Sequence, residues 1–373
     1  MKVIFVSTSY PEGKKDWRGR FIAEMIDSLS HVNGLALNTW MPPGEMPENV
    51  LDAALPRESS WLEALMKQGG IAHIFRQKKI MGKRRLITLI FLLRKLYHRT
   101  SNFDLAHVNW LQNTLPLWRI PLPLIVSVLG TDFKLLQIPG MRTALRKIFR
   151  ERKCIIAPNA SWMEPELNNL FGDVAEIRTI PFGVNEKWYR IRRNSLCENA
   201  PQKWISVFRV TKNKIGPLFN WGNDIFNTNC QYHLLGPNIE KLVLPPWTHF
   251  QGSTHPAELE QKWFPEAHGL ISLSEHDEGR PQVILEAMAA GLPVIASDLP
   301  AHRDVIRHKK TGWLVSSAQD FKNGLSYLSN RENNMRIGDS ARDWVTNHIG
   351  TWSDCAARYV TAYQDLMGNV NET

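Results

Sequence analysis

The stretch "EHDEGRPQVILEAMAAGLPVIASD", from Glu275 to Asp298, decides the fold. Its middle has the spacing of a short apolar helix, followed by a Gly-Leu-Pro break and an apolar strand pattern. Pro281 suits the first turn of a helix, because the N–H that proline lacks would be unpaired there anyway. The pattern therefore predicts a loop, a helix over 281–290 and a buried strand over 293–296.

The start of this helix is a candidate anion site. The residues Glu278, Gly279 and Arg280 form the loop that leads into it. The N–H groups of Gln282 and Val283 then have no acceptor within the helix, and such a helix N-terminus suits a phosphate. Gly279 allows a ligand to approach the backbone closely.

Glu286 is the unusual residue of the helix, because its neighbours Val283 to Ala290 are otherwise apolar. A buried carboxylate is costly without partners. It lies about five residues into the helix, roughly 7.5 Å along the axis. The diol of a nucleotide ribose, beside a diphosphate at the helix start, would suit it. A structural carboxylate that accepts from backbone N–H groups or from an arginine is the alternative reading.

Two series of short apolar strands with helices between them flank this stretch. Such alternation indicates βαβ units and parallel sheets. The polar, poorly patterned residues 185–203 separate the two series. We expect an N-terminal domain over 1–184 and a second Rossmann-like domain over 185–345. A C-terminal segment over 346–373, including an amphipathic helix over 351–367, should pack back on the first domain.

The bulk composition limits the functional classes. The chain has 373 residues, 43% of them hydrophobic, and a net charge of +9, which favours an anionic partner. Four cysteines without metal-ligand spacing, and the lack of a signal-peptide pattern or a long apolar run, favour a cytoplasmic protein with no metal site. No nucleic-acid-binding motif is visible, so we expect no nucleic-acid partner.

Residues 76–99 form a basic, apolar segment without an acidic residue. A helix of this kind can lie on an anionic membrane surface, although a core helix with solvated basic ends is the alternative. The basic residues are Arg76, Lys78, Lys79, Lys83, Arg84, Arg85, Arg94, Lys95 and Arg99.

The stretch from Glu275 to Val315 resembles the donor-binding signature of family 4 of the retaining glycosyltransferases: Glu, seven residues, Glu, then an Ala-Met-Ala-x-Gly-x-Pro-Val run. Further segments resemble the same family over nearly the whole chain, namely "STSYPEGKKDWRGRFIAEM", "FDLAHVNW", "PLPLIVSVLGTDF", "IPFGVNEKWY" and "WISVFRVTKNKIG". The resemblance implies the GT-B fold: two Rossmann-like domains that face each other across a cleft, with the C-terminal helix crossing back to the first.

The resemblance also implies roles for individual residues. Glu286 would hold the ribose, Glu278 would face the donor sugar, and Arg209 with Lys214 would neutralise the diphosphate. Fixed cations of this kind stabilise a leaving diphosphate without a metal, although two such residues alone more often form a solvated surface. The remaining residues assigned to the donor are Gly279, Arg280, Gln282, Val283 and Gly236, and those assigned to the acceptor side are Gly19, Arg20, Leu129, Gly130 and Asp132.

The sequence departs from the family pattern at several of these places. Phe208 and Ile215 replace the glycines that flank the Arg…Lys loop, and Phe182 replaces the Asn of the junction motif. Leu129 replaces a His that contacts the donor, so only its backbone carbonyl would approach the sugar, and Asp132 would take over a polar role. His107 is expected to be a core histidine with satisfied hydrogen bonds.

The resulting hypothesis is a metal-independent, retaining glycosyltransferase of the hexosyltransferase type that needs no cofactor. It would transfer sugar from a UDP- or GDP-type donor to a glycan or lipid-linked acceptor in bacterial envelope polysaccharide or oligosaccharide synthesis, on the inner face of the cell membrane. The alternatives are a membrane-surface binding protein with a degenerate GT-B fold and a sugar-nucleotide 2-epimerase.

Overall fold

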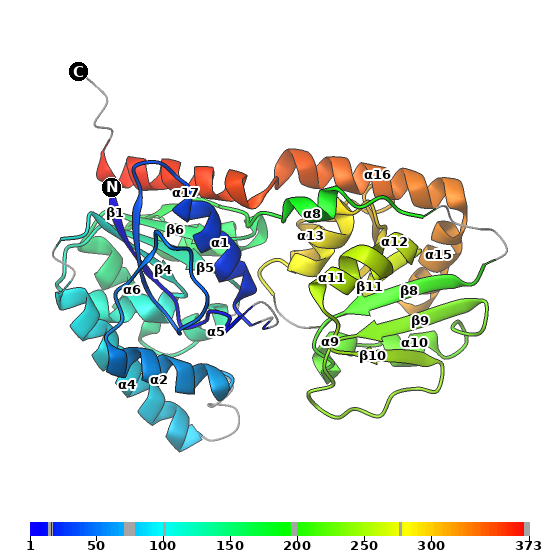
Figure 1. The fold of residues 1–373 in the computed structure, drawn as a ribbon, viewed down its shortest axis with the longest axis horizontal. Coiled ribbons are helices and arrows are strands. Elements are labelled where there is room, and N and C mark those ends of the chain that lie inside the picture. Colours follow the sequence, from blue (N-terminus) through cyan, green and yellow to red (C-terminus); the bar gives the residue numbers. More distant parts are fainter. Residues whose placement is uncertain are drawn as a thin grey trace. The chain divides into compact units, whose positions relative to one another are not determined.

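The computed structural model describes residues 1–13, 16, 18–70, 79–99, 102–130, 132–194, 200–275 and 278–368, without the side chains of residues 79 and 80. The chain divides into two compact units, one made of Met1–Phe182 with Trp352–Thr373 and one made of Gly183–Thr351 (Figure 1). Each unit has its own sheet and its own core.

The described part of the first unit forms a seven-stranded sheet in the order β3-β2-β1-β4-β5-β6-β7, and every strand pair is parallel. The strand order reverses direction between β1 and β4. The strands are β1 (Lys2–Val6), β2 (Ala36–Trp40), β3 (Leu51–Asp52), β4 (Leu105–Asn109), β5 (Leu124–Val128), β6 (Cys154–Pro158) and β7 (Glu176–Ile177).

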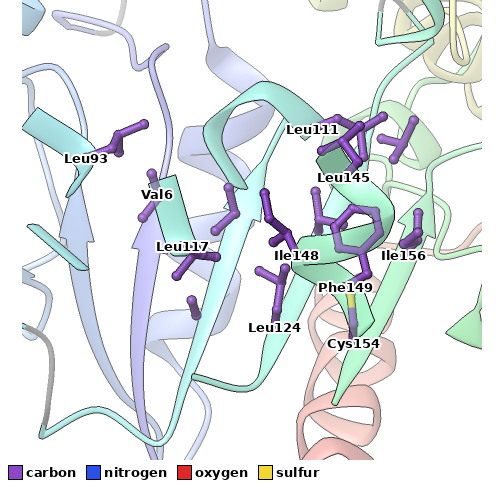
Figure 2. Close-up of a cluster of buried hydrophobic side chains, with 14 of the residues drawn as sticks. Val6, Leu93, Leu111, Leu117, Leu124, Leu145, Ile148, Phe149, Cys154 and Ile156 are labelled. Carbon is purple, nitrogen blue, oxygen red and sulfur yellow. The ribbon is translucent and has the colours of Figure 1, made fainter. Parts of the chain in front are cut away.

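Helices cover both faces of this sheet, as a parallel sheet requires. On one face, α1 (Arg20–Ser30) and α17 (Trp352–Met367) pack together over side chains such as Val3 and Phe5. On the other, α4 (Lys79–His98), η1 (Leu111–Leu117) and α6 (Met141–Arg150) bury Ile4, Val6 and their neighbours (Figure 2). The remaining helices are α2 (Pro56–Lys67), α5 (Phe133–Leu136), η2 (Ser161–Met163) and α7 (Glu164–Phe171).

A buried polar network ties α17 to the sheet. Nδ1 of His107 lies 2.6 Å from the hydroxyl of Tyr363, and Nε2 lies 2.8 Å from Oγ of Ser127. Ser127 in turn bonds the hydroxyl of Tyr359 at 2.7 Å. Burial lowers the pKa of His107 to about 3, so the ring is neutral. The prediction of a satisfied core histidine is confirmed.

The described part of the second unit forms a six-stranded parallel sheet in the order β10-β9-β8-β11-β12-β13. Its strand order reverses between β8 and β11. The strands are β8 (Gln202–Val207), β9 (Cys230–Leu235), β10 (Thr248–Gly252), β11 (Gly269–Ser272), β12 (Val294–Ser297) and β13 (Trp313–Val315).

The helix α13 (Gln282–Ala289) lies against β11, β12 and α16 (Arg331–His348), where Ile284, Leu285 and Met288 are fully buried. The helices α15 (Ala318–Ser329) and α16 have Ser317 and Asn330 as N-caps, whose side chains accept hydrogen bonds from N–H groups of the first turn. The other helices are α8 (Glu186–Tyr189), α9 (Lys212–Ile215), α10 (Leu218–Gly222), α11 (Pro256–Glu258), the π-helix η3 (Leu259–Trp263), α12 (Phe264–Glu266) and α14 (Pro300–Arg303).

The predicted fold class is confirmed: two Rossmann-like α/β units with parallel sheets, and a last helix that packs on the first unit. Within the residues that the structure describes, no helix combines the length and the apolar character needed to cross a bilayer.

Candidate functional site

The second sheet brings two of the predicted loops together. In open parallel sheets a ligand binds beyond the carboxyl ends of the strands, at the point where the strand order reverses. That point lies between β8 and β11. Arg209 and Lys214 follow β8, and Glu278 follows β11. Residues that are distant in sequence therefore meet at the edge where a nucleotide is expected.

Lys214 and Glu278 are in direct contact. Nζ of Lys214 meets Oε1 of Glu278, and the two side chains are 18% and 17% exposed. Burial and then the positive charge of Arg209 lower the pKa of Lys214, to about 7. The Glu278 carboxylate acts in the opposite sense, because an adjacent negative charge favours the ammonium form. The charge of Lys214 is therefore sensitive to any anion that arrives beside it.

Gly216 seats the Lys214 loop on the end of β11. Its φ is +53°, and a Cβ at this position would lie 2.1 Å from the carbonyl oxygen of Leu273. The carbonyl of Asn213 also accepts a hydrogen bond from the N–H of Glu275 at 2.8 Å. Gly216, the residue after Ile215, thus supplies the close approach of backbone to backbone at this loop.

Gly236 has a similar function at the end of β9. Its φ is +128°, and a Cβ would lie 1.9 Å from the carbonyl oxygen of Phe208. The loop after β9 therefore lies directly against the residue that precedes Arg209. Arg209 itself is exposed at this edge.

The helix α13 begins at Gln282, one residue later than predicted, and Pro281 is its N-cap in extended conformation. Gly279 is buried, Pro281 precedes the helix, and Gln282 and Val283 are its first residues. Gln282, Val283 and Glu286 are the half-buried side chains of a helix whose other side chains are buried. Residues three and four apart share a helix face, so Glu286 lies on the stripe that begins at the helix N-terminus. The amide of Gln282 donates to the carbonyl of Gly183 at 2.7 Å.

Arg280 is bound to Asp304, a residue that the sequence reasoning did not consider. Nε of Arg280 donates to Oδ2 of Asp304 at 2.9 Å, and the two side chains are 6% and 2% exposed. The guanidinium therefore holds the loop between Glu278 and α13 in place. A sequence signal for this contact is weak, because the two residues lie in different loops.

The residues assigned to the acceptor side gather at the carboxyl edge of the first sheet. Gly19 has φ +67°, and a Cβ there would lie 2.6 Å from Oγ of Ser9. Arg20 begins α1 and pairs with Glu24 at 3.6 Å. Leu129 and Gly130 follow β5.

Asp132 joins the loop after β4 to the loop after β5. Its Oδ1 accepts from the N–H of Leu111 and its Oδ2 from the N–H of Leu129, both at 2.8 Å. Burial raises the pKa of Asp132, to about 6, while the two N–H donors act in the opposite direction. Both carboxylate oxygens are engaged with backbone, so this side chain positions Leu129 and the start of η1.

A cavity of about 300 Å³ opens beside the loops that follow β1 and β2. This volume is at the lower end of the range for small-molecule sites, about 300–1,000 Å³. Polar and apolar side chains line it in similar measure: Tyr10, Glu12, Asp16, Arg18, Pro42, Pro43, Gly44, Glu63, Met66 and Lys67.

The second sheet edge thus offers a cation pair, helix N–H groups and two carboxylates. Cations and helix N–H groups bind phosphate, and carboxylates accept hydrogen bonds from hydroxyls. Among the described residues, no group of three or more His, Cys, Asp or Glu side chains is placed to hold a metal ion.

Comparison with known proteins agrees with this chemistry. Residues 239–344 match the family model of glycosyl transferases group 1. A similar curated protein is the glycosyltransferase 1 domain-containing protein 1 of Xenopus tropicalis, 34% identical over 100 residues, which are 26% of this chain and 28% of that protein. The matched part therefore spans about a quarter of that relative.

Two solved structures extend the likeness over almost the whole chain. The sucrose-phosphate synthase from Thermosynechococcus elongatus has a TM-score of 0.71 at 17% identity, with 98% of this chain and 99% of that chain covered. HepE from Anabaena, in complex with UDP and glucose, has a TM-score of 0.66 at 12% identity, with 98% and 100% covered. The two parallel-sheet units thus match glycosyltransferase structures of the GT-B type.

Proposed function

We propose that this protein is a glycosyltransferase that transfers a hexose from a UDP- or GDP-type nucleotide sugar to a hydroxyl of a glycan or lipid-linked acceptor. The observation that carries the proposal is the meeting of Lys214, Glu278 and the start of α13 where the second sheet reverses its strand order. The family match of residues 239–344 supports the same reaction class.

The donor roles follow from the geometry of α13. The diphosphate binds at the N–H groups of Gln282 and Val283, beside Arg209 and Lys214. Glu286, one turn further along the same stripe, accepts hydrogen bonds from the ribose hydroxyls. Glu278 lies beside Lys214 and faces the donor sugar.

The chemical step breaks the bond between the anomeric carbon and the diphosphate oxygen. The negative charge that develops on that oxygen is stabilised by Arg209, Lys214 and the helix N–H groups, which are already in place before the reaction. The acceptor oxygen forms the new bond to the anomeric carbon on the same face, and its proton passes to the departing phosphate oxygen. This retaining, metal-independent course rests on the family resemblance and on the cations beside the site.

The acceptor side is proposed at the carboxyl edge of the first sheet. There Gly19, Arg20, Leu129 and Gly130 lie on loops that follow β1 and β5. The neighbouring cavity of about 300 Å³ carries carboxylates and cations suited to a hydroxyl-rich molecule.

The test is nucleotide affinity of Glu286→Ala. Loss of hydrogen bonds to a charged group costs about 1.5–3 kcal/mol, which corresponds to a roughly 10- to 150-fold higher Kd for the preferred nucleotide diphosphate. Isothermal titration calorimetry with UDP and GDP measures the change, and a melting curve checks the fold. Glu332→Ala, an exposed carboxylate in the first turn of α16, is the matched control and should bind as the wild type does. Wild-type affinity in Glu286→Ala would contradict the ribose assignment.

Two alternatives remain as outcomes of activity measurements with nucleotide sugars. Membrane binding without nucleotide binding or sugar transfer would favour a degenerate GT-B fold with a binding role. Conversion of a nucleotide sugar into its 2-epimer would favour an epimerase.

The helix α4 is the proposed membrane-docking surface, with the enzyme on the inner face of the cell membrane. Its described residues begin at Lys79, so Arg76 and Lys78 of the predicted segment lie outside them. Ile87 is 67% and Phe91 56% exposed, with Lys83, Arg84 and Lys95 exposed along the same helix. Exposed apolar side chains among cations are the pattern of a helix that lies on an anionic bilayer.

Not every cation of the segment is available for lipid. Arg94 donates to the carbonyl of Pro116 at 2.9 Å, and Arg99 pairs with Glu58. Arg94 also donates to the carbonyl of Trp118, a residue that is 42% exposed. The guanidinium of Arg119 lies 4.5 Å from the centroid of the Trp118 ring. An exposed tryptophan beside cations extends the surface, because such rings are enriched at the headgroup level of membranes.

Liposome co-sedimentation tests the docking surface. Changing Lys83, Arg84 and Lys95 to Glu should abolish sedimentation with vesicles that contain anionic lipid, since about 1 kcal/mol per basic residue is lost and repulsion is added. The matched control changes three exposed cations of the second unit, Lys310, Lys322 and Arg331, to Glu. Equal sedimentation of the two triple variants would remove α4 from the docking surface.

A further inference from the structure

The end of β12 and the helix after it contact both loops of the proposed donor site. The residues concerned are Ser297, the last residue of β12, the single-turn helix α14 and Asp304, which caps that helix. Two separate sets of contacts lead from it, one to the loop of Glu278 and one to the loop of Lys214.

The first set is the Arg280–Asp304 ion pair. Arg280 lies two residues after Glu278 and directly before Pro281, and its guanidinium turns to Asp304. With 6% and 2% exposure, the pair is almost fully buried. A buried ion pair is poor evidence for stability, because the desolvation of both charges offsets their attraction, and well-packed apolar residues often serve as well. The pair does fix the direction in which the loop enters α13.

The second set begins at His302, which is 1% exposed. Its Nδ1 lies 2.7 Å from the carbonyl oxygen of Ser297, so this nitrogen carries the proton. Oγ of Ser297 donates to the carbonyl of Ser274 at 2.6 Å. Oγ of Ser274 and the N–H of Glu275 both donate to the carbonyl oxygen of Asn213, at 3.5 and 2.8 Å. Asn213 directly precedes Lys214 in the sequence.

We propose that Asp304, His302 and Ser297 are positioning residues that set the distance between Lys214 and Glu278 and thereby the site for a nucleoside diphosphate. The inference rests on the proposed function and adds residues to it. These side chains hold the two loops that are proposed to contact the diphosphate and the sugar, whereas Glu286, the proposed ribose ligand, lies one turn further along α13. The diphosphate part of the ligand should therefore depend on them more than the nucleoside part does.

The experiment removes the ion pair without leaving a buried charge. Replacing both partners together, Arg280→Met with Asp304→Leu, preserves approximate volume and should keep the protein folded, whereas Asp304→Asn alone would leave the guanidinium without its carboxylate. Ser297→Ala breaks the second set of contacts at its middle. Arg303→Met removes an exposed cation of the same helix that pairs with Asp298, and it is the matched control. Melting curves report folding for each protein.

The readout is the affinity ratio between nucleoside diphosphate and monophosphate, UDP with UMP or GDP with GMP, by isothermal titration calorimetry. In the double variant and in Ser297→Ala we expect the diphosphate Kd to rise at least tenfold and the monophosphate Kd less than threefold. We expect Arg303→Met to bind as the wild type does. Wild-type diphosphate affinity in the folded double variant would overturn the proposal. Equal losses for both ligands would also overturn it, because they indicate a general structural role. If the wild type binds neither nucleotide, the proposed function fails and the inference fails with it.

Discussion

Replacement of Gly216 by alanine tests whether the end of β11 seats the Lys214 loop. Two effects oppose the new side chain. The backbone has φ +53° and ψ −134°, a conformation that costs a residue with a Cβ about 1–3 kcal/mol. The added Cβ would also lie 2.1 Å from the carbonyl oxygen of Leu273, and forced overpacking typically costs about 1–3 kcal/mol.

Together these effects should lower the free energy of unfolding by about 3 kcal/mol. For a domain of 150–250 residues this corresponds to a fall in Tm of roughly 6–12 °C. The hydrogen bond between Glu275 and Asn213 lies beside this clash, so its relief should shift Lys214 relative to Glu278. Affinity for a nucleoside diphosphate should therefore fall at least tenfold in the folded fraction.

Gly252→Ala is the matched control in the same unit. Its φ is +72°, but no atom of the described residues outside its own chain neighbours lies within 4 Å of the new Cβ. It should lose only the backbone term, about 1 kcal/mol. Differential scanning calorimetry compares the two variants, and equal Tm values would show that the Leu273 carbonyl does not determine the path of the Lys214 loop.

Two further predictions concern the charges of the site. Sugar transfer should persist in excess EDTA, because Arg209, Lys214 and the start of α13 carry the phosphate charge; loss of transfer with rescue by Mg²⁺ or Mn²⁺ would contradict this. Burial and the charge of Arg209 lower the pKa of Lys214 to about 7, so phosphate binding above pH 7 should be accompanied by uptake of a proton. The affinity should therefore fall as the pH rises from 7 to 9, by up to about tenfold per pH unit. Calorimetry in buffers of different ionisation enthalpy measures the proton uptake, and Lys214→Met should show none. A wild-type affinity that does not change between pH 7 and pH 9 would contradict the prediction and mean that Glu278 keeps the ammonium group charged.

The central strands and the helix of the donor signature could be predicted because their patterns are local. Strands such as β1, β4 and β12 are short apolar runs between polar loops, and α13 has proline at its start and a Gly-Leu-Pro break after its end. The edge strands were missed for the opposite reason. The strand β10 reads Thr-His-Phe-Gln-Gly and is mostly exposed, and β3 has two residues, so neither shows a buried face in the sequence.

Some elements differ from the prediction in detail. The apolar pattern of residues 177–180 predicts a strand, whereas β7 covers only Glu176–Ile177. The spacing of residues 258–263 predicts one helix, but α11, η3 and α12 follow one another there, with Pro265 in α12. The helix α16 was not predicted from the sequence, although Ile337, Ala341 and Val345 are buried and lie four residues apart, which indicates one helix face.

The site was predictable as far as spacing and topology reach. Glu278, Gln282, Val283 and Glu286 belong to one local motif, and Lys214 joins them because β8 and β11 are neighbours in the sheet. Asp304 was not predictable in the same way. Its pairing with Arg280 depends on where α14 lies after β12, and neither spacing nor composition determines that position.

The polar groups of the first sheet indicate where acceptor specificity originates. On the first sheet, His107 and Asp132 are buried and bonded to Tyr363, Ser127 and backbone N–H groups. Groups that are so engaged cannot discriminate among acceptors without breaking hydrogen bonds that are costly to lose. Accessible carboxylates such as Glu12 and Glu63 line the cavity beside the loops after β1 and β2. We therefore expect acceptor preference to change with substitutions at Glu12 or Glu63 and to stay unchanged with conservative substitutions at Leu129.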